Sequence, residues 1–138
     1  MSQNNSPFAL GVSDFSTSEP LQNAETIIAS GMDFIEPGLA KIASMSDQDF
    51  AEAAARIKQS EISVRSVNWF LPPEVKVTGP DVDDDKSKQF LSIALPRAVT
   101  LGATAVVFGS PGSRSIPDGF SQEKGIQQLI QFLSLIHI

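Results

Sequence analysis

The sequence predicts an α/β fold in which parallel strands are joined by helices. Short apolar runs alternate, about four times, with segments whose apolar residues recur at helical spacing. Glycine also follows two of the predicted helices, directly before the next apolar run, at Gly31 and Gly102. A helix that returns the chain to the start of a neighbouring strand makes a βαβ crossover, so we expect a parallel sheet.

The first crossover is predicted between strands at residues 8–15 and 32–36. The apolar residues of segment 21–30 lie at helical spacing, so this segment is expected to form the connecting helix: Leu21, Ala24, Ile27 and Ile28. Gly31 is the expected stop, because glycine readily adopts the left-handed conformation that ends many helices.

The second crossover leads to a strand at residues 62–70. Ser46 can cap its helix, which should run to about Ser60, because a serine hydroxyl accepts a hydrogen bond from a free N–H of the first turn. The apolar stripe of this helix follows the pattern i, i+3, i+4, i+7: Phe50, Ala53, Ala54 and Ile57. Two prolines, Pro72 and Pro73, should end the strand, since proline cannot continue a ladder.

The last two helices are expected at residues 85–101 and after Ser121. Pro96 should kink the first of them, and Gly102 should end it. Between them, the continuous apolar run at 104–108 predicts a strand that is buried on both faces. The apolar stripe of the last helix is Ile126, Leu129, Ile130 and Leu133.

The size of the chain fits one domain. The 138 residues, 41% of them hydrophobic, suffice for a single packed core, so we expect one domain over 1–138. No apolar run approaches the roughly 20 residues of a membrane span, and the first residues lack the basic region of a secretory signal. We therefore expect a soluble, cytoplasmic protein with no membrane partner.

Charge and residue inventory argue against several classes of function. The formal net charge is −6 and the basic residues do not cluster, so no nucleic-acid partner is expected. The sequence contains no cysteine, which excludes disulfides, zinc–thiolate sites and thiol nucleophiles. The one histidine, His137, is next to last, so no Ser-His-Asp triad or multi-histidine metal site is expected. The acidic run 81–85 is expected to be a solvated loop.

Two architectures fit this order of elements. The predicted strands begin near residues 8, 32, 62 and 104, a spacing of about 32 residues, and an eight-unit TIM barrel uses roughly 31 residues per unit. The chain would then hold about four of eight (β/α) units, a half barrel. The alternative is an open, doubly wound sheet with flavodoxin-like strand order, although the loops after the first and third strands are not glycine-rich.

Three segments together resemble the sugar phosphate isomerase/epimerase family. They read GMDFIEPG at 31–38, VNWFLPP at 67–73 and VVFGSPGSRSIP at 106–117. The family has the xylose-isomerase-like TIM-barrel fold, and the resemblance covers about residues 8–133, the N-terminal half of the family only. Each segment lies at the C-terminal end of its predicted strand, where barrel enzymes carry their chemistry.

The resemblance implies metal-assisted proton transfer next to a sugar carbonyl, through an enediolate. In the family, two Glu, one Asp and one His from the second half hold a divalent metal ion, and those strands lie outside this sequence. We therefore expect no metal ligand in this chain, and no activity from the chain alone. Residues 134–138 extend an apolar helix without a cap, which a truncated gene or a non-native tail explains better than a natural terminus.

The candidate substrate-binding residues are Glu36, Asn68, Gly109 and Arg114. The resemblance assigns Glu36 to a sugar hydroxyl, with an exposed loop carboxylate as the alternative. Asn68, expected on the same face as Ile62, Val64 and Ser66, offers a donor and an acceptor to a polyol, unless its amide only caps a loop. The backbone amides of the loop 109–115, and Arg114, suit an anion or a polyol, unless the arginine only bonds loop carbonyls.

Four further residues favour structural interpretations. Trp69 and Phe70 could form a wall against a sugar ring, but aromatic residues at a strand end are more often part of the core. Asp14 is expected to cap the first helix, and Arg65 to fill the barrel interior or pair with a carboxylate.

The expected ligand is thus a sugar or sugar phosphate. A different class of function stays open, namely a stand-alone sugar- or phosphate-binding module that forms a homo-oligomer to complete its sheet. An exposed apolar edge at the strand 104–108 would favour such association.

Overall fold

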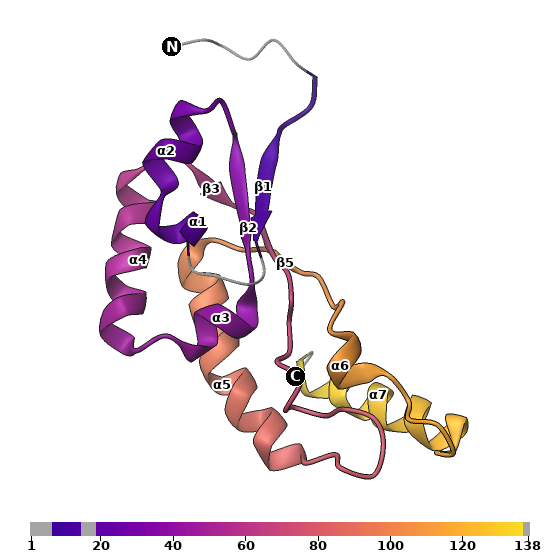
Figure 1. The fold of residues 1–138 in the computed structure, drawn as a ribbon. Helices are drawn as coiled ribbons and strands as arrows, with labels where there is room; N and C mark the ends of the chain where they lie inside the picture. Colours follow the sequence, from indigo (N-terminus) through magenta and orange to yellow (C-terminus); the bar gives the residue numbers. More distant parts are fainter. Residues whose placement is uncertain (1–6, 15–18, 137–138) are drawn as a thin grey trace.

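The computed structural model describes residues 7–14 and 19–136 (Figure 1). Its strands are β1 (Gly11–Asp14), β2 (Phe34–Pro37), β3 (Ser63–Val64), β4 (Ser66–Val67) and β5 (Ala105–Val106). Its helices are α1 (Glu19–Gln22), α2 (Ala24–Ala29), α3 (Leu39–Ser44), α4 (Asp47–Gln59), α5 (Asp84–Leu101), α6 (Pro111–Arg114) and α7 (Gln122–Ile136).

All strand pairs in the described residues are parallel, which confirms the predicted α/β class. One sheet has the order β1-β2-β3 and the other pairs β4 with β5. Only Arg65 separates β3 from β4, so these two strands are successive parts of one extended segment. If they are counted as one strand, each strand pairs with the next one along the chain. In a flavodoxin-like order the first strand lies between the second and the third. Here β2 occupies that central place, which makes the flavodoxin-like alternative wrong.

The helices cover one side of the β1–β2 pair, where α1 to α4 lie together in Figure 1. Strand residues on that side are buried in the core, including Ile35, Val64 and Val67. Gly11 and Ser13 are exposed on the opposite side. The sheet therefore has one covered face and one open face.

The predicted third strand, 62–70, is broken at Arg65. Its first part pairs with β2, and the second part pairs with β5, with the N–H of Thr104 bonded to the Arg65 carbonyl at 3.0 Å. The break shifts the alternation, so that Val64 and Val67 are both buried. Asn68 and Ser66 consequently lie on the face opposite to Ile62 and Val64, and the prediction of a shared face was wrong.

The predicted fourth strand is also less buried than expected. Val106 is 37% exposed and Val107 is 48% exposed, whereas burial on both faces was predicted. Within the described residues β5 pairs with β4 alone, so its other edge is free. The apolar residues of β5 are therefore not buried on both sides in this chain.

The predicted helix ends agree well with the structure. The Ser46 hydroxyl accepts from the N–H of Asp49 at 3.1 Å, and that of Ser121 accepts from Lys124 at 3.3 Å. Gly31 and Gly102 have φ of 82° and 94°, the left-handed conformation expected at the stops.

Other helix details differ from the expectations. The first helix is interrupted at Asn23, and α3 and α6 were not predicted. The acidic run is not a loop throughout, because Asp83 caps α5 and the two following aspartates lie in its first turn. Helix α7 buries Gly125 and Phe132, while Ile126 and Ile130 of the predicted stripe are exposed. It extends to Ile136, so residues 134–136 are helical.

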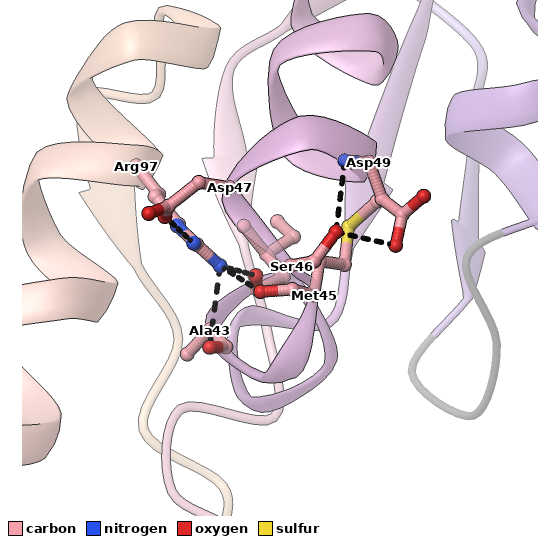
Figure 2. Close-up of polar contacts among 7 residues, drawn as sticks. Ala43, Met45, Ser46, Asp47, Asp49 and Arg97 are labelled. Atoms are coloured by element: carbon pink, nitrogen blue, oxygen red, sulfur yellow. Dashed lines mark hydrogen bonds and ion pairs between the residues drawn. The ribbon is translucent and has the colours of Figure 1, made fainter.

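A buried arginine joins α5 to α3 and α4 (Figure 2). Arg97 is 9% exposed, and its Nη1 donates to the carbonyls of Ile42, Ala43 and Met45 at 2.8, 3.2 and 2.8 Å. Its Nη2 donates to Asp47 at 2.6 Å. Arg97 thus supplies donors to the carbonyls at the end of α3, where the helix itself offers few. No helix in the described part of the chain is long and apolar enough to cross a membrane.

Candidate functional site

A cluster of polar side chains lies where the parallel strands end. Ser13 of β1 and Ser66 of β4 both donate to the carboxylate of Glu36, which is on β2 between them. The Ser13 contact, from Oγ to Oε1, measures 3.4 Å. Asn68, directly after β4, donates from Nδ2 to the Ser13 Oγ at 2.5 Å. Four residues from three strands therefore form one hydrogen-bonded cluster.

The direction of these bonds fixes the orientation of the Asn68 amide. A carboxylate offers only acceptors, so the Ser13 proton is used on Glu36. The Ser13 oxygen can then only accept from Asn68, which places Nδ2 on that side. Asn68 is 9% exposed, and its Oδ1 is buried without a hydrogen-bond partner in the described part of the structure. A buried acceptor of this kind is one that a ligand donor can satisfy.

The backbone around Asn68 is held by β2 and α3. The Asn68 N–H donates to the carbonyl of Pro37 at 3.1 Å, and its own carbonyl accepts from the N–H of Leu39 at 2.8 Å. The Trp69 carbonyl accepts from the N–H of Ala40 at 3.1 Å. Trp69 has φ of 37°, which is uncommon for a residue other than glycine. The first turn of α3 thus stabilises a strained strand end.

A pocket of about 420 Å³ lies beside the cluster, between the end of β4 and helix α6. Its wall consists of Asn68, Trp69, Pro73, Val107, Gly109, Ser110, Pro111 and Gly112. Ser110 also has a positive φ, of 29°, and its hydroxyl accepts from the N–H of Leu71 at 2.9 Å. Both of the non-glycine residues with positive φ in the described chain therefore lie in the wall of this pocket. Strain of this kind is concentrated at functional sites.

The structure places two of the four predicted binding residues in the wall of this pocket. Asn68 and Gly109 line the pocket. Glu36 does not line it, but is linked to Asn68 by hydrogen bonds through the Ser13 hydroxyl. Arg114 does not line the pocket, and its Nε donates to the carbonyl of Gly109 at 2.5 Å.

The other sequence candidates are distributed more widely. Trp69 lines the pocket, whereas Phe70 is buried and packs against Phe108 with ring centroids 5.4 Å apart, as the core interpretation predicted. Arg65 is exposed and stacks over the ring of Phe34 at 5.3 Å. The predictions for the Asp14 side chain and for His137 lie outside what the structure describes.

Three serines of the site were missed by the sequence analysis. Ser13, Ser66 and Ser110 have ordinary neighbours in sequence, and their importance arises from contacts across strands. Position is a signal for Ser13 and Ser110, which lie near the ends of the predicted strands 8–15 and 104–108, but not for Ser66, in the middle of the predicted strand 62–70.

A second hollow, of about 350 Å³, lies beside α3 and α4, away from the strand ends. Charged side chains of both signs line it, namely Lys41, Asp49, Glu52 and Arg56. All four are exposed to water, and no buried polar atom there lacks a partner in the described chain. The pocket beside Asn68 is therefore the stronger candidate.

The described residues do not fit the divalent metal ion that the family resemblance implies. Among them there is no group of three or more His, Asp or Glu side chains that could hold an ion. Glu36 is the one carboxylate in the cluster, and hydroxyl groups occupy both of its oxygens. No step through a metal ion can be assigned to these residues.

Comparisons with known proteins identify a fold and not a family. No protein-family model matches the sequence, and no curated protein matches it either. The structure is similar to the crystal structure of 3-keto-D-glucoside 4-epimerase, YcjR, from E. coli, in its apo form. The TM-score is 0.66 at 12% sequence identity, and the match covers 94% of this chain and 50% of that chain. The chain therefore shares the fold of about half of a sugar epimerase.

Proposed function

We propose that the chain forms the N-terminal half of a TIM-barrel sugar or sugar phosphate isomerase or epimerase. The observation that carries this proposal is the buried, unpartnered Oδ1 of Asn68 beside an aromatic-walled pocket at the carboxyl ends of parallel strands. Ligands of barrel enzymes bind at this end of the strands. The shared fold with half of a sugar epimerase supports the substrate class.

In this proposal each site residue has a separate role. Glu36 and Asn68 bind sugar hydroxyls, because a carboxylate and an amide together supply acceptors and donors to a polyol. Trp69 covers an apolar face of the ring, and the backbone at Gly109 completes the wall. Arg114 either holds that loop through the Gly109 carbonyl or turns to the substrate.

The proposed reaction moves a proton at the carbon next to the sugar carbonyl. The second half of the barrel would supply the metal ligands and the remaining proton-transfer groups. The chain alone is then expected to bind sugar without converting it.

The test is to read the gene beyond codon 138 and to assay the protein that the whole reading frame encodes. We expect four further βα units, and exchange of the substrate C–H with deuterium from D2O, followed by NMR. Glu36→Gln should lower the exchange rate about tenfold, because it weakens the contact with a sugar hydroxyl. Glu52→Gln, on the exposed face of α4, is the matched control and should leave it unchanged. A reading frame that stops after codon 138 would contradict the half-barrel proposal.

A second candidate function is a sugar-binding module that pairs with another copy of itself. It is favoured by the uncovered Val106 and Val107 at the free edge of β5. Sugar binding by a stable dimer of this chain, without a longer gene product, would favour this candidate.

A further inference from the structure

We infer that the pocket beside Asn68 takes an uncharged sugar and discriminates against its phosphate ester. This inference rests on the proposed function, because it specifies the substrate of the same site. Three features of the pocket support it. They are the absence of charge among the described residues of its wall, the hydrogen bonds that nearby cations make to wall carbonyls, and the donors and acceptors that remain for a ligand.

No cationic side chain belongs to the wall of this pocket in the described structure. The wall is mostly apolar, with Trp69, Pro73, Val107 and Pro111, and its polar side chains are Asn68 and Ser110. Sites that bind phosphate esters commonly use arginine or lysine side chains, or several converging N–H groups. Here Pro111 removes one backbone N–H from the loop that would have to supply them.

Two cationic side chains donate to carbonyl groups of the wall residues. The Nζ of Lys76 bonds the carbonyl of Gly112 at 2.5 Å, and the Nε of Arg114 bonds the carbonyl of Gly109 at 2.5 Å. Glu36 is the only charged side chain in the hydrogen-bonded cluster that includes Asn68. A negative charge on Glu36 disfavours an anion nearby.

The hydrogen-bonding groups of the pocket fit a hydroxyl better than a phosphate. Asn68 Oδ1 is an acceptor without a partner, so it requires a donor from the ligand. Ser110 already accepts from the N–H of Leu71, which leaves its own proton for a ligand oxygen. Sugar hydroxyls both donate and accept, whereas a phosphate dianion only accepts. A sugar hydroxyl can therefore satisfy both groups, whereas a phosphate group placed at the Asn68 oxygen would face it with another acceptor.

The full chain offers a direct reporter, because Trp69 is its only tryptophan and it has no tyrosine. We would titrate the protein with two matched pairs, D-glucose with D-glucose 6-phosphate and D-fructose with D-fructose 6-phosphate, and follow Trp69 emission. In at least one pair we expect the neutral sugar to bind saturably and its phosphate ester to bind about tenfold or more weakly, the loss that one unsatisfied polar contact causes. This comparison uses the wild-type chain and does not depend on a variant that folds poorly.

Two variants locate the binding. Asn68→Ala should weaken the neutral sugar about tenfold, since it removes the acceptor. Asn23→Ala, an exposed asparagine whose side chain makes no capping bond, is the matched control and should bind as the wild type does. Circular dichroism confirms that both variants are folded.

The outcomes separate this inference from the proposed function. Binding of a phosphate ester at least as tightly as its neutral partner, with loss of that binding in Lys76→Ala or Arg114→Ala, overturns the inference and leaves the proposed function in place. Binding of neither member of either pair overturns the proposed function itself, and the inference with it. Preference for a neutral sugar that Asn68→Ala abolishes supports both.

Discussion

Arg97 shows how one side chain can hold three helices together. Its guanidinium lies under the end of α3, bonds three carbonyls there and also reaches Asp47 at the start of α4 (Figure 2). It stacks over the ring of Phe50 with 4.9 Å from Cζ to the ring centroid. Because α3 bonds the backbone of Asn68 and Trp69 at its other end, Arg97 also supports the pocket from a distance.

Replacing Arg97 with methionine should destabilise the protein strongly. Arg97→Met keeps the length of the side chain but removes the guanidinium donors from three buried or part-buried carbonyls, at a cost of about 3 kcal/mol in the free energy of unfolding. Asp47→Asn is the control, because the Asp47 side chain is fully exposed and its ion pair is screened by water. Urea denaturation of both variants measures the difference. Equal losses would mean that the ion pair, and not the carbonyl contacts, stabilises this corner.

The sequence predicted those residues of the candidate site whose place in the fold follows from their position at the end of a strand. Glu36 and Asn68 follow predicted strands, and the ends of parallel strands meet at one edge, so their proximity followed from the fold class. The serines that connect Glu36 and Asn68 could not be predicted in this way, because serine is common in loops. The role of Ser13 depends on its register with Glu36 across the two strands. The hydrogen bond from Arg114 to Gly109 likewise depends on the turn of α6, where only a loop was predicted.

For individual helices, the capping residues predict where a helix begins and ends better than the length of its apolar pattern does. Ser46 both accepts from the Asp49 N–H and donates to the Asp49 carboxylate, at 3.1 and 2.7 Å. We expect Ser46→Ala to lower the free energy of unfolding by about 1 kcal/mol, the usual cost of a lost N-cap. Ser44→Ala removes an exposed hydroxyl that only bonds the carbonyl of Lys41, and it should have a smaller effect. Thermal and urea unfolding compare them, and equal effects would contradict the capping role.

The stop of α5 depends on backbone conformation and not on space. Gly102 has φ of 94°, and a Cβ there would meet its nearest atom, the carbonyl oxygen of Val64, at an ordinary 3.6 Å. Gly102→Ala should therefore cost about 1 kcal/mol through strain alone. Gly102→Asn should cost less, because asparagine tolerates the left-handed region better. Urea denaturation of the two variants tests this order, and a reversed order would assign the cost to packing.

The elements that the sequence did not predict are those defined by tertiary contacts. The break at Arg65 arises because β3 pairs with β2 while β4 pairs with β5, and no local pattern encodes that change of partner. Helix α3 is short, and its last carbonyls are satisfied by Arg97, more than 50 residues away along the chain. Isolated helices of this length are unstable in water, so only the folded chain could reveal it.

For the whole molecule, the open face of the sheet is the dominant feature. It carries the ring of Phe34 beneath Arg65, with Gly11 leaving room for that ring, because a Cβ at Gly11 would lie 2.3 Å from it. It also carries Val107, which is apolar and 48% exposed, whereas Val106 is in register with the buried Val67 of the covered face. In a closed barrel this face would be the interior, where such residues pack in layers. The composition of β5 therefore matches a covered face better than the open one that this chain presents.

We therefore expect the isolated chain to associate through the edge of β5. An exposed apolar edge strand is a template for pairing with another chain, so sedimentation velocity should show growth in size as concentration rises. Lysine substitution at both positions, Val106→Lys with Val107→Lys, should suppress this association, because charge on an edge strand opposes pairing. Val99→Lys is the matched control, since Val99 is a 72% exposed valine on α5, and it should associate as the wild type does. Association that persists in the double variant but disappears in Val99→Lys would place the contact on the helices. The edge of β5 would then not be the surface through which the chain associates.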